Sequence, residues 1–353
     1  MKKICLIEFT PNHYDFIIAA ANYFGEIAEV EVFIHEDVYV SLVYEYTTNY
    51  SNFKKPHINT YRNYKELIQE SFINFDEIIF LSITFTWKII FIYYLTRKIK
   101  IPYSIAIHSI NSWLKFGKLN FKNLVRFYIK KRIYEKSKHI IVLSKYQKET
   151  LIEIVSKEIF IIPFKLPVIG LKSVKNSKFT IVVPGTVDNK KRDYKGILKI
   201  LDELQSNCIL ILLGKMKDDE IKQKIRENEN IIWFNGFVTQ NIFDKYLKQC
   251  DIILAPTIQK YTWGSSSTEF YGITKASGAE FDCIKYRKKL LINEFYNIDN
   301  FLIKNNIVHR FSDLEDLKNK LDQLILHHKG NYNDETIDTY NKMLKQNFLE
   351  EWN

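Results

Sequence analysis

The sequence predicts an α/β protein made of two halves, each with a mostly parallel sheet that helices cover on both faces. Strand and helix patterns alternate along most of the 353 residues, and such alternation is typical of parallel sheets. The pattern breaks near Pro163 and Pro167 and starts again at Phe179. The length suits two domains, which we expect over residues 1–168 and 169–333.

The first half reads as a regular series of short apolar strands and helices. Its expected strands are Lys3–Phe9, Val30–Ile34, Ile78–Ile83, Tyr103–His108, His139–Leu143 and Ile159–Ile162. Its expected helices are Tyr14–Phe24, Tyr64–Ser71, Trp87–Ile99, a basic helix within Lys115–Lys138, and Lys145–Val155.

One apolar run, Ile78–Leu95, has the length of a membrane span. Lys88 interrupts it, so we expect a buried strand followed by a buried helix. Residues 164–178 show no clear periodicity and are predicted to link the halves.

The second half repeats the alternation. Its expected strands are 179–185, Cys208–Leu213, Ile231–Phe234, Ile252–Ala255 and Leu290–Asn293. Its expected helices are Gly196–Gln205, Asp218–Glu227, Gln240–Gln249, a helix that opens at Ser277, and Asp313–His327. The tail, 334–353, reads as a polar helix with an apolar stripe, and we expect it to return to the first half.

Composition excludes several classes of protein. The four cysteines lie far apart without C-x-x-C spacing, so no zinc site or disulfide framework is indicated, and a reducing cytoplasm fits. The N-terminus MKKICLIEF is too short in apolar residues for a signal peptide and reads as a strand.

The net charge of +10 is concentrated in Lys115–Lys138, which holds nine basic residues and one acid among aromatic and apolar ones. A basic helix with aromatics is typical of a membrane-surface contact. A solvated helix face over a core stripe explains it equally well. Nucleic acid is a weaker reading, because no recognition motif accompanies the helix.

Loops that follow parallel strands are the expected ligand sites. The turn Gly185-Thr186 follows an apolar strand, and the segment after it carries four cations, Lys190, Lys191, Arg192 and Lys195. Such a turn with cations can bind a diphosphate, and a charged surface loop is the alternative.

A second candidate is Ser277-Gly278-Ala279, at the start of a helix that carries Glu280 and Asp282 in its first turns. Backbone N–H groups at a helix N-terminus attract anions, and Gly278 permits close approach. The alternative is a capping box, with Ser277 as the N-cap and Glu280 at N3.

Three more loops follow predicted strands. Gly236 and Phe237 lie after Ile231–Phe234, His108 ends Tyr103–His108, and His13-Tyr14 follows the first strand. The sequence has no G-x-G-x-x-G, no G-x-x-x-x-G-K-[ST], no Asp-x-Asp and no G-x-S-x-G, which disfavours dinucleotide oxidoreductases, P-loop enzymes, metal-dependent sugar-nucleotide enzymes and esterases.

Together these segments resemble glycosyltransferases of the GT-B fold, in particular the large retaining group known as family 4. The most specific stretch is ENIIWFNGFVTQNIFDKYLKQCDIILAPT. KSKHIIVLSKYQKETL with IFIIPF, and IVVPGTV with its later Lys-Gly, resemble other parts of that group. The resemblance implies two Rossmann-like domains that face each other across a cleft.

The resemblance also assigns roles to residues. The family grips its donor with a Glu-x7-Glu motif, whose second carboxylate falls on Asp282 and whose first falls on Thr274, beside Lys275. Glu269 is the nearest glutamate, at the wrong spacing. The family's phosphate-binding turn falls on Ser277 and Gly278, next to Ala279.

Three further roles are implied for catalysis. His108 matches a family histidine near the transferred sugar, and Lys195 matches a lysine on the donor diphosphate. Arg192 or Lys190 takes the arginine role, because Thr186 stands where the family arginine usually does. Gly185, Thr186, Gly236 and Phe237 are expected at the donor, and His13 and Tyr14 at the acceptor.

The implied function is transfer of a sugar from a nucleotide donor, expected to be a UDP-sugar, to a glycan or lipid-linked saccharide, with net retention and without metal or cofactor. This chemistry suits surface polysaccharide or glycoconjugate synthesis in the cytoplasm, at the inner membrane face. Two alternatives remain open. They are a non-catalytic glycosyltransferase-like subunit, because a glutamate is missing, and a sugar-nucleotide epimerase of the same fold.

Overall fold

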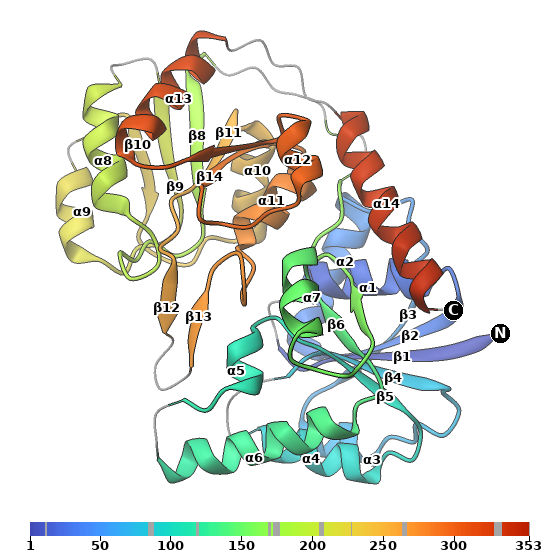
Figure 1. Ribbon diagram of the computed structural model, residues 1–353. Coiled ribbons are helices and arrows are strands. Elements are labelled where there is room, and N and C mark those ends of the chain that lie inside the picture. Colours follow the sequence, from blue (N-terminus) through green and yellow to red (C-terminus); the bar gives the residue numbers. More distant parts are fainter. Residues whose placement is uncertain are drawn as a thin grey trace.

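The computed structural model describes residues 1–10, 13–83, 88–117, 120–168, 171, 177–204, 208–226, 228–262, 267–327 and 334–352. It contains two large sheets that stand side by side, and every strand pairing within them is parallel (Figure 1). Most strand residues are buried and apolar, as expected for sheets that helices cover on both faces.

The first sheet has the order β3-β2-β1-β4-β5-β6-β7. Its strands are β1 (Lys2–Glu8), β2 (Ala28–His35), β3 (His57–Tyr61), β4 (Glu77–Ser82), β5 (Tyr103–Ala106), β6 (Ile140–Val142) and β7 (Ile159–Ile161). Its helices are α1 (Tyr14–Phe24), α2 (Glu36–Thr48), α3 (Tyr64–Gln69), α4 (Ile89–Lys98), α5 (Ile110–Leu114), α6 (Phe121–Lys136) and α7 (Lys145–Ile152).

The second sheet has the order β10-β9-β8-β11-β14-β15. Its strands are β8 (Phe179–Pro184), β9 (Cys208–Lys215), β10 (Ile231–Phe234), β11 (Ile252–Ala255), β14 (Lys289–Asn293) and β15 (Val308–Phe311). Its helices are α8 (Tyr194–Glu203), α9 (Asp219–Ile225), α10 (Gln240–Gln249), α11 (Gly278–Tyr286), α12 (Asn300–Lys304) and α13 (Leu314–Leu326).

The strand order reverses between β1 and β4 in the first sheet and between β8 and β11 in the second. At such a switch point the loops on either side leave in opposite directions and open a crevice for a ligand. The loops after β1 and β8 carry His13 and Gly185, so both predicted loops lie at these points.

The last helix, α14 (Asp334–Trp352), lies against the first half of the chain (Figure 1). Phe348 is buried among the rings of Tyr23, Phe24 and Phe160, and the Trp352 ring centroid is 4.4 Å from that of Phe160. This return confirms the predicted fold class. The exact domain boundaries stay predictions, because residues 169–170, 172–176 and 328–333 lie outside the described part of the chain.

Several elements were not predicted from the sequence. Helix α2 consists largely of tyrosine and β-branched residues, which are weak helix formers, and packing of Val38, Leu42 and Tyr46 along one face stabilises it. Two short strands, β12 (Lys260–Thr262) and β13 (Thr268–Phe270), form a hairpin that extends towards α5 (Figure 1).

The expectation of a fully buried helix after β4 is wrong for α4. Ile90, Phe91 and Tyr94 are exposed, whereas Ile89, Ile92 and Leu95 are buried. A helix with apolar residues all round needs cover on every side. Among the described elements α4 packs against α3 and α6, and its buried face joins the core of the first half. Trp87, the expected first residue, lies outside the described residues.

Candidate functional site

Arg192 joins two loops at the switch point of the second sheet. Its Nη1 atom donates to the Thr186 carbonyl at 3.0 Å, and its backbone pairs with Thr257, which follows β11. Gly185 adopts a φ of 93°, which L side chains rarely adopt, and a Cβ there would lie 3.0 Å from the guanidinium. The glycine turn and the Arg192 side chain are therefore packed directly against each other.

Further cations gather around Arg192 and this turn. The pKa of Lys191 is lowered, first by burial and then by the positive charges of Arg192, Lys217 and Lys275. Among the described residues, the buried Nε atom of Arg192 has no hydrogen-bond partner. Asp188 acts on Lys191 in the opposite direction. The carboxyl edge of the second sheet thus brings several cations near one carboxylate, which favours binding of an anion.

The N-terminus of α11 contributes to the same region. A Cβ on Gly278 would meet nothing within 4 Å, so the backbone there is open to a ligand. The Ser277 N–H donates to the Tyr296 hydroxyl at 2.7 Å, and the Ser277 side chain makes no capping bond. Lys275, just before the helix, donates to Ser109 of the first half at 2.7 Å.

The capping-box alternative is wrong for Glu280. This carboxylate is buried and accepts hydrogen bonds from the Tyr146 and Tyr296 hydroxyls at 2.7 and 2.6 Å. Burial raises its pKa to about 7. Because Tyr146 lies on α7 of the first half, Glu280 links the two halves beneath the start of α11.

Asp282, the predicted ribose ligand, is buried between the halves. Its Oδ1 atom accepts from Lys165 at 2.7 Å, and Lys165 also lies 3.2 Å from Asp15. Burial raises the pKa of Asp282 despite the nearby lysines. A buried carboxylate with an ammonium partner does not face a ligand, so the structure does not place Asp282 at the donor site.

Thr274, where the family glutamate was expected, is also buried and engaged. Its hydroxyl donates to Glu269 at 2.7 Å and accepts from the Phe270 N–H at 2.8 Å. Glu269 does fold back to this place, but its carboxylate accepts from the backbone N–H groups of Asn111 and Ser112 at 3.3 and 2.6 Å. It connects the hairpin to α5.

Lys195 and Lys190 are not brought into the cation cluster. Lys195 points towards α9, where its ammonium lies 2.8 Å from Glu220, and about half of its side chain is exposed. Lys190 is exposed beside Asp188. The helix begins two residues before Gly196 and turns Lys195 outward. Lys217, which the sequence reasoning missed, also follows a parallel strand and could have been found by that rule.

In the first half, His108 and His13 lie together at the carboxyl edge of the sheet. Their ring centroids are 4.9 Å apart, and Phe164 packs against both rings. His108 Nε2 donates to the Leu81 carbonyl at 2.9 Å, which leaves Nδ1 as an acceptor. Burial lowers the pKa of His108 well below its ordinary value.

Two predicted loops have other surroundings. The Tyr14 hydroxyl donates to Gln240 of α10, so it bridges the halves. Phe237 is 84% exposed, and Gly236 beside it has open space around its Cα. Both Gly236 and Phe237 remain accessible at the end of β10.

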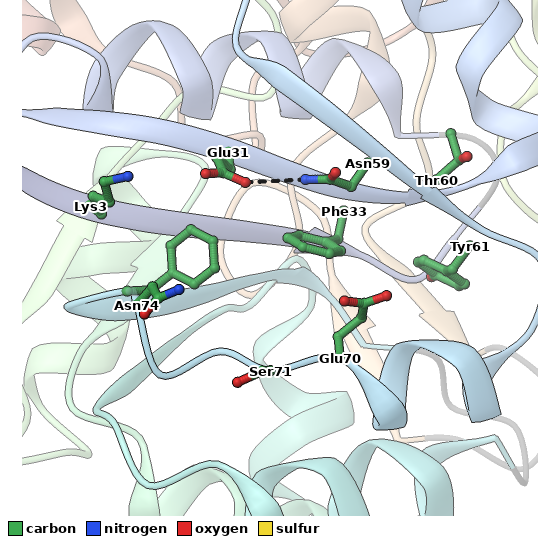
Figure 2. Close-up of a pocket in the computed structure, with 10 residues that line it drawn as sticks. Lys3, Glu31, Phe33, Asn59, Thr60, Tyr61, Glu70, Ser71 and Asn74 are labelled. Carbon is green, nitrogen blue, oxygen red and sulfur yellow. Dashed lines mark hydrogen bonds between the residues drawn. The ribbon is translucent and has the colours of Figure 1, made fainter.

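A pocket of about 350 Å³ lies elsewhere, over β1 to β3 and the segment 70–75 (Figure 2). Figure 2 shows Lys3, Glu31 and Glu70 around it, with Asn59 donating to Glu31 at 3.2 Å. None of the predicted site residues lines it. Within the described part of the chain, no group of three or more His, Cys, Asp or Glu side chains is placed to hold a metal ion.

Comparison with known proteins identifies the architecture. No protein-family model matches the sequence, and no curated protein matches it significantly. Among solved structures, Anabaena HepE in complex with UDP and glucose aligns with 99% of this chain and 96% of its own, with a TM-score of 0.61 and 12% identity. The lipopolysaccharide outer core galactosyltransferase WaaB aligns over 99% of each chain, with a TM-score of 0.54 and 11% identity.

The chain has the GT-B fold. UDP-GlcNAc 2-epimerase from Neisseria meningitidis, bound to UDP-GlcNAc, is similar to the same extent, covering 100% of this chain and 99% of its own with a TM-score of 0.54 and 11% identity. The solved structures that share this fold therefore include both glycosyltransferases and epimerases. Membership of retaining family 4 is not shown by these similarities.

Proposed function

We propose that this protein transfers a sugar from a nucleoside-diphosphate donor to a saccharide hydroxyl. The observation that carries the proposal is the cationic cluster around Arg192 and Lys275, beside the open backbone at Gly278. A diphosphate has the charge and size to bind there. Helix N-termini and arginine side chains are both good phosphate ligands.

The cluster suits the chemistry of transfer. A bond forms between the acceptor oxygen and the anomeric carbon, while the bond from that carbon to the diphosphate oxygen breaks. The electron pair of the broken bond leaves with the diphosphate, which takes up the proton of the acceptor hydroxyl. Arg192, Lys275 and the α11 backbone amides would stabilise the leaving charge without a metal ion. His108 would lie near the transferred sugar, across the interface from Lys275.

A UDP-sugar is the donor we favour, because HepE and WaaB, a galactosyltransferase, share the fold and HepE holds UDP and glucose. We propose net retention on the basis of the resemblance to family 4. An NMR comparison of the anomeric configuration in donor and product tests it. The acceptor we propose is a glycan or lipid-linked saccharide of a cell-surface polymer.

A lipid-linked acceptor fits one surface of the first half. Phe121, Leu124 and Tyr128 are exposed on α6. This helix packs against α4, where Ile90, Phe91 and Tyr94 are exposed. Arg132 and the other cations of α6 surround them. None of the described helices is long and apolar enough to cross a membrane. From the exposed apolar residues and cations of α4 and α6 we propose contact with the surface of an anionic cytoplasmic leaflet.

A donor panel tests the proposed function. Calorimetric titration with UDP and GDP should show binding of UDP. Incubation with UDP-sugars and an acceptor extract should release UDP, with a matching mass increase in the acceptor. Absence of both nucleotide binding and transfer would instead favour a non-catalytic subunit.

The epimerase alternative has specific support, because epimerases such as that of Neisseria meningitidis share the fold. Such an enzyme needs no acceptor. Proton NMR of UDP-GlcNAc with the protein alone would show a second sugar epimer under this alternative and an unchanged sugar under our proposal.

A further inference from the structure

A buried carboxylate, Glu8, lies behind His13 at the end of β1. Glu8 has no exposed side-chain surface, and its Oε1 atom accepts from the backbone N–H and the hydroxyl of Thr10, both at 2.7 Å, and from Ser82. The His13 Nδ1 atom lies 3.8 Å from the same oxygen. A fully buried glutamate at a strand end needs a reason, because burying its charge is costly.

Two polar atoms in this cluster remain unsatisfied. Among the described residues, neither Glu8 Oε2 nor His13 Nδ1 has a hydrogen-bond partner, although both atoms are buried. About 28% of the His13 side chain is nevertheless exposed. Since Nδ1 is buried, the exposed surface of this side chain belongs to its other atoms, and Nε2 is not among the buried atoms that lack a partner.

We propose that Glu8 is a positioning residue that holds His13 with its proton on Nδ1, so that Nε2 can accept a hydrogen bond from a hydroxyl of the acceptor. An imidazole is oriented by the group that binds its other nitrogen. Glu8 supplies that group from within the sheet, and a small movement of the ring would close the gap. Hydrogen bonds of this kind are often long until substrate binds.

The two histidines would then carry their protons on different ring nitrogens. His108 donates from Nε2 to Leu81, which leaves its Nδ1 as an acceptor, whereas His13 would present Nε2. The inference rests on the proposed function only in naming a saccharide as the owner of the hydroxyl. The form of His13 is a property of the protein alone.

The charges around the pair set its pH dependence. Burial raises the pKa of Glu8 to about 7, and burial, together with Lys275, lowers the pKa of His13 to about 4, with Asp15 acting in the opposite direction. Ser82 of β4 and Thr10 face Glu8, and its charge also affects Tyr61 of β3 and Tyr64 of α3. His108 packs on the His13 ring.

These pKa values predict that the tautomer of His13 changes with pH, which NMR can detect. His13 stays neutral between pH 5.5 and 8.5, while Glu8 ionises near pH 7. Ionised Glu8 can only accept, which favours the Nδ1–H form. Protonated Glu8 can donate to Nδ1, which favours the Nε2–H form.

The experiment uses the full-length protein labelled with ¹⁵N-histidine, with the His13→Gln variant to identify the signal. Long-range ¹H–¹⁵N spectra should show the Nδ1–H form at pH 8.5 and the Nε2–H form at pH 5.5, with a midpoint near pH 7. In Glu8→Gln, whose amide can donate, the Nε2–H form should persist at both pH values. A wild-type protein in the Nε2–H form at pH 8.5, or a variant that keeps Nδ1–H, would overturn the proposal.

UDP binding and sugar transfer are measured separately in the Glu8→Gln variant. Glu8→Gln should bind UDP as the wild type does, and should lower transfer by about 10- to 100-fold, the usual effect of removing an orienting partner. Wild-type transfer by the variant would overturn the positioning role. If neither protein binds UDP, the proposed function fails, whereas the NMR result still decides the form of His13.

Discussion

Lys285 of α11 is completely buried against Asp15 of α1, with its ammonium 2.8 Å from the carboxylate. Glu45 of α2 lies 3.1 Å from the same ammonium, and Lys165 pairs with both Asp15 and Asp282 nearby. The halves of the molecule are therefore joined by charges that water does not reach. Each of these charges depends on its partner across the interface.

Lys285→Met should destabilise the protein by about 3–5 kcal/mol, because it leaves Asp15 and Glu45 buried without their shared cation. The midpoint of urea unfolding measures the effect. Lys148→Met is the matched control, since Lys148 pairs with Glu351 at 2.6 Å in a more exposed setting and should change the midpoint far less. A variant of Lys285 as stable as the control would show that the buried ion pair contributes little.

Arg192→Ala should weaken UDP binding by about 10- to 100-fold, the loss expected for a contact between a charged donor and phosphate. Lys195→Ala should bind UDP as the wild type does, because its ammonium pairs with Glu220 outside the cluster. Calorimetric titration of both variants gives the comparison. Equal losses in the two variants would contradict the placement of the diphosphate.

The contribution of Glu280 to stability should fall as the pH rises from about 4.5 to about 7. The pKa of Glu280 is raised from its ordinary value near 4.5 to about 7 by burial, so the folded state holds a proton there that the unfolded state has released. The stabilising contribution is complete below pH 4.5 and is lost as the pH passes 7.

Glu280→Gln should keep the tyrosine contacts and remove this contribution, so that between pH 5 and 8 its unfolding midpoint falls less, or rises more, than that of the wild type. Glu229→Gln, at an exposed position, is the control and should retain the wild-type slope. An unchanged slope in Glu280→Gln would argue against a titrating Glu280 in this range.

Binding to vesicles tests the surface of α4 and α6. The protein should sediment with vesicles that contain phosphatidylglycerol, more weakly at high salt, and not with neutral phosphatidylcholine vesicles. The double change Leu124→Glu and Tyr94→Glu should abolish sedimentation. Leu326→Glu, at an exposed position on α13, should leave it intact.

Much of the fold could be predicted from sequence patterns. Most strands of both sheets are short apolar runs, and their alternation with helices leaves few other arrangements. The polar edge strands β3 and β15 were not predicted. Helix α2 and the β12–β13 hairpin were missed, because contacts with distant parts of the chain stabilise them. Val38 and Glu269 are examples, one packed in the core of the first half and the other bonded to α5.

The candidate site was predicted in part. Loops after parallel strands are where ligands bind, so Gly185, His13 and His108 were found by position. The direction of a side chain on a helix was harder to predict. Lys195 follows Arg192 by only three residues, but it lies on α8 and turns to Glu220, whereas Arg192 lies in the loop and turns to Gly185.

The sequence by itself determined that this chain forms two parallel sheets with cationic and glycine-containing loops at their carboxyl edges, since strand and helix periodicities are local. Only the tertiary structure decided what each carboxylate does. Glu280 and Asp282 are two residues apart, so they face different sides of α11, one towards Tyr146 and the other towards Lys165. Which partner each side meets depends on how the two halves pack, and no local pattern encodes that packing.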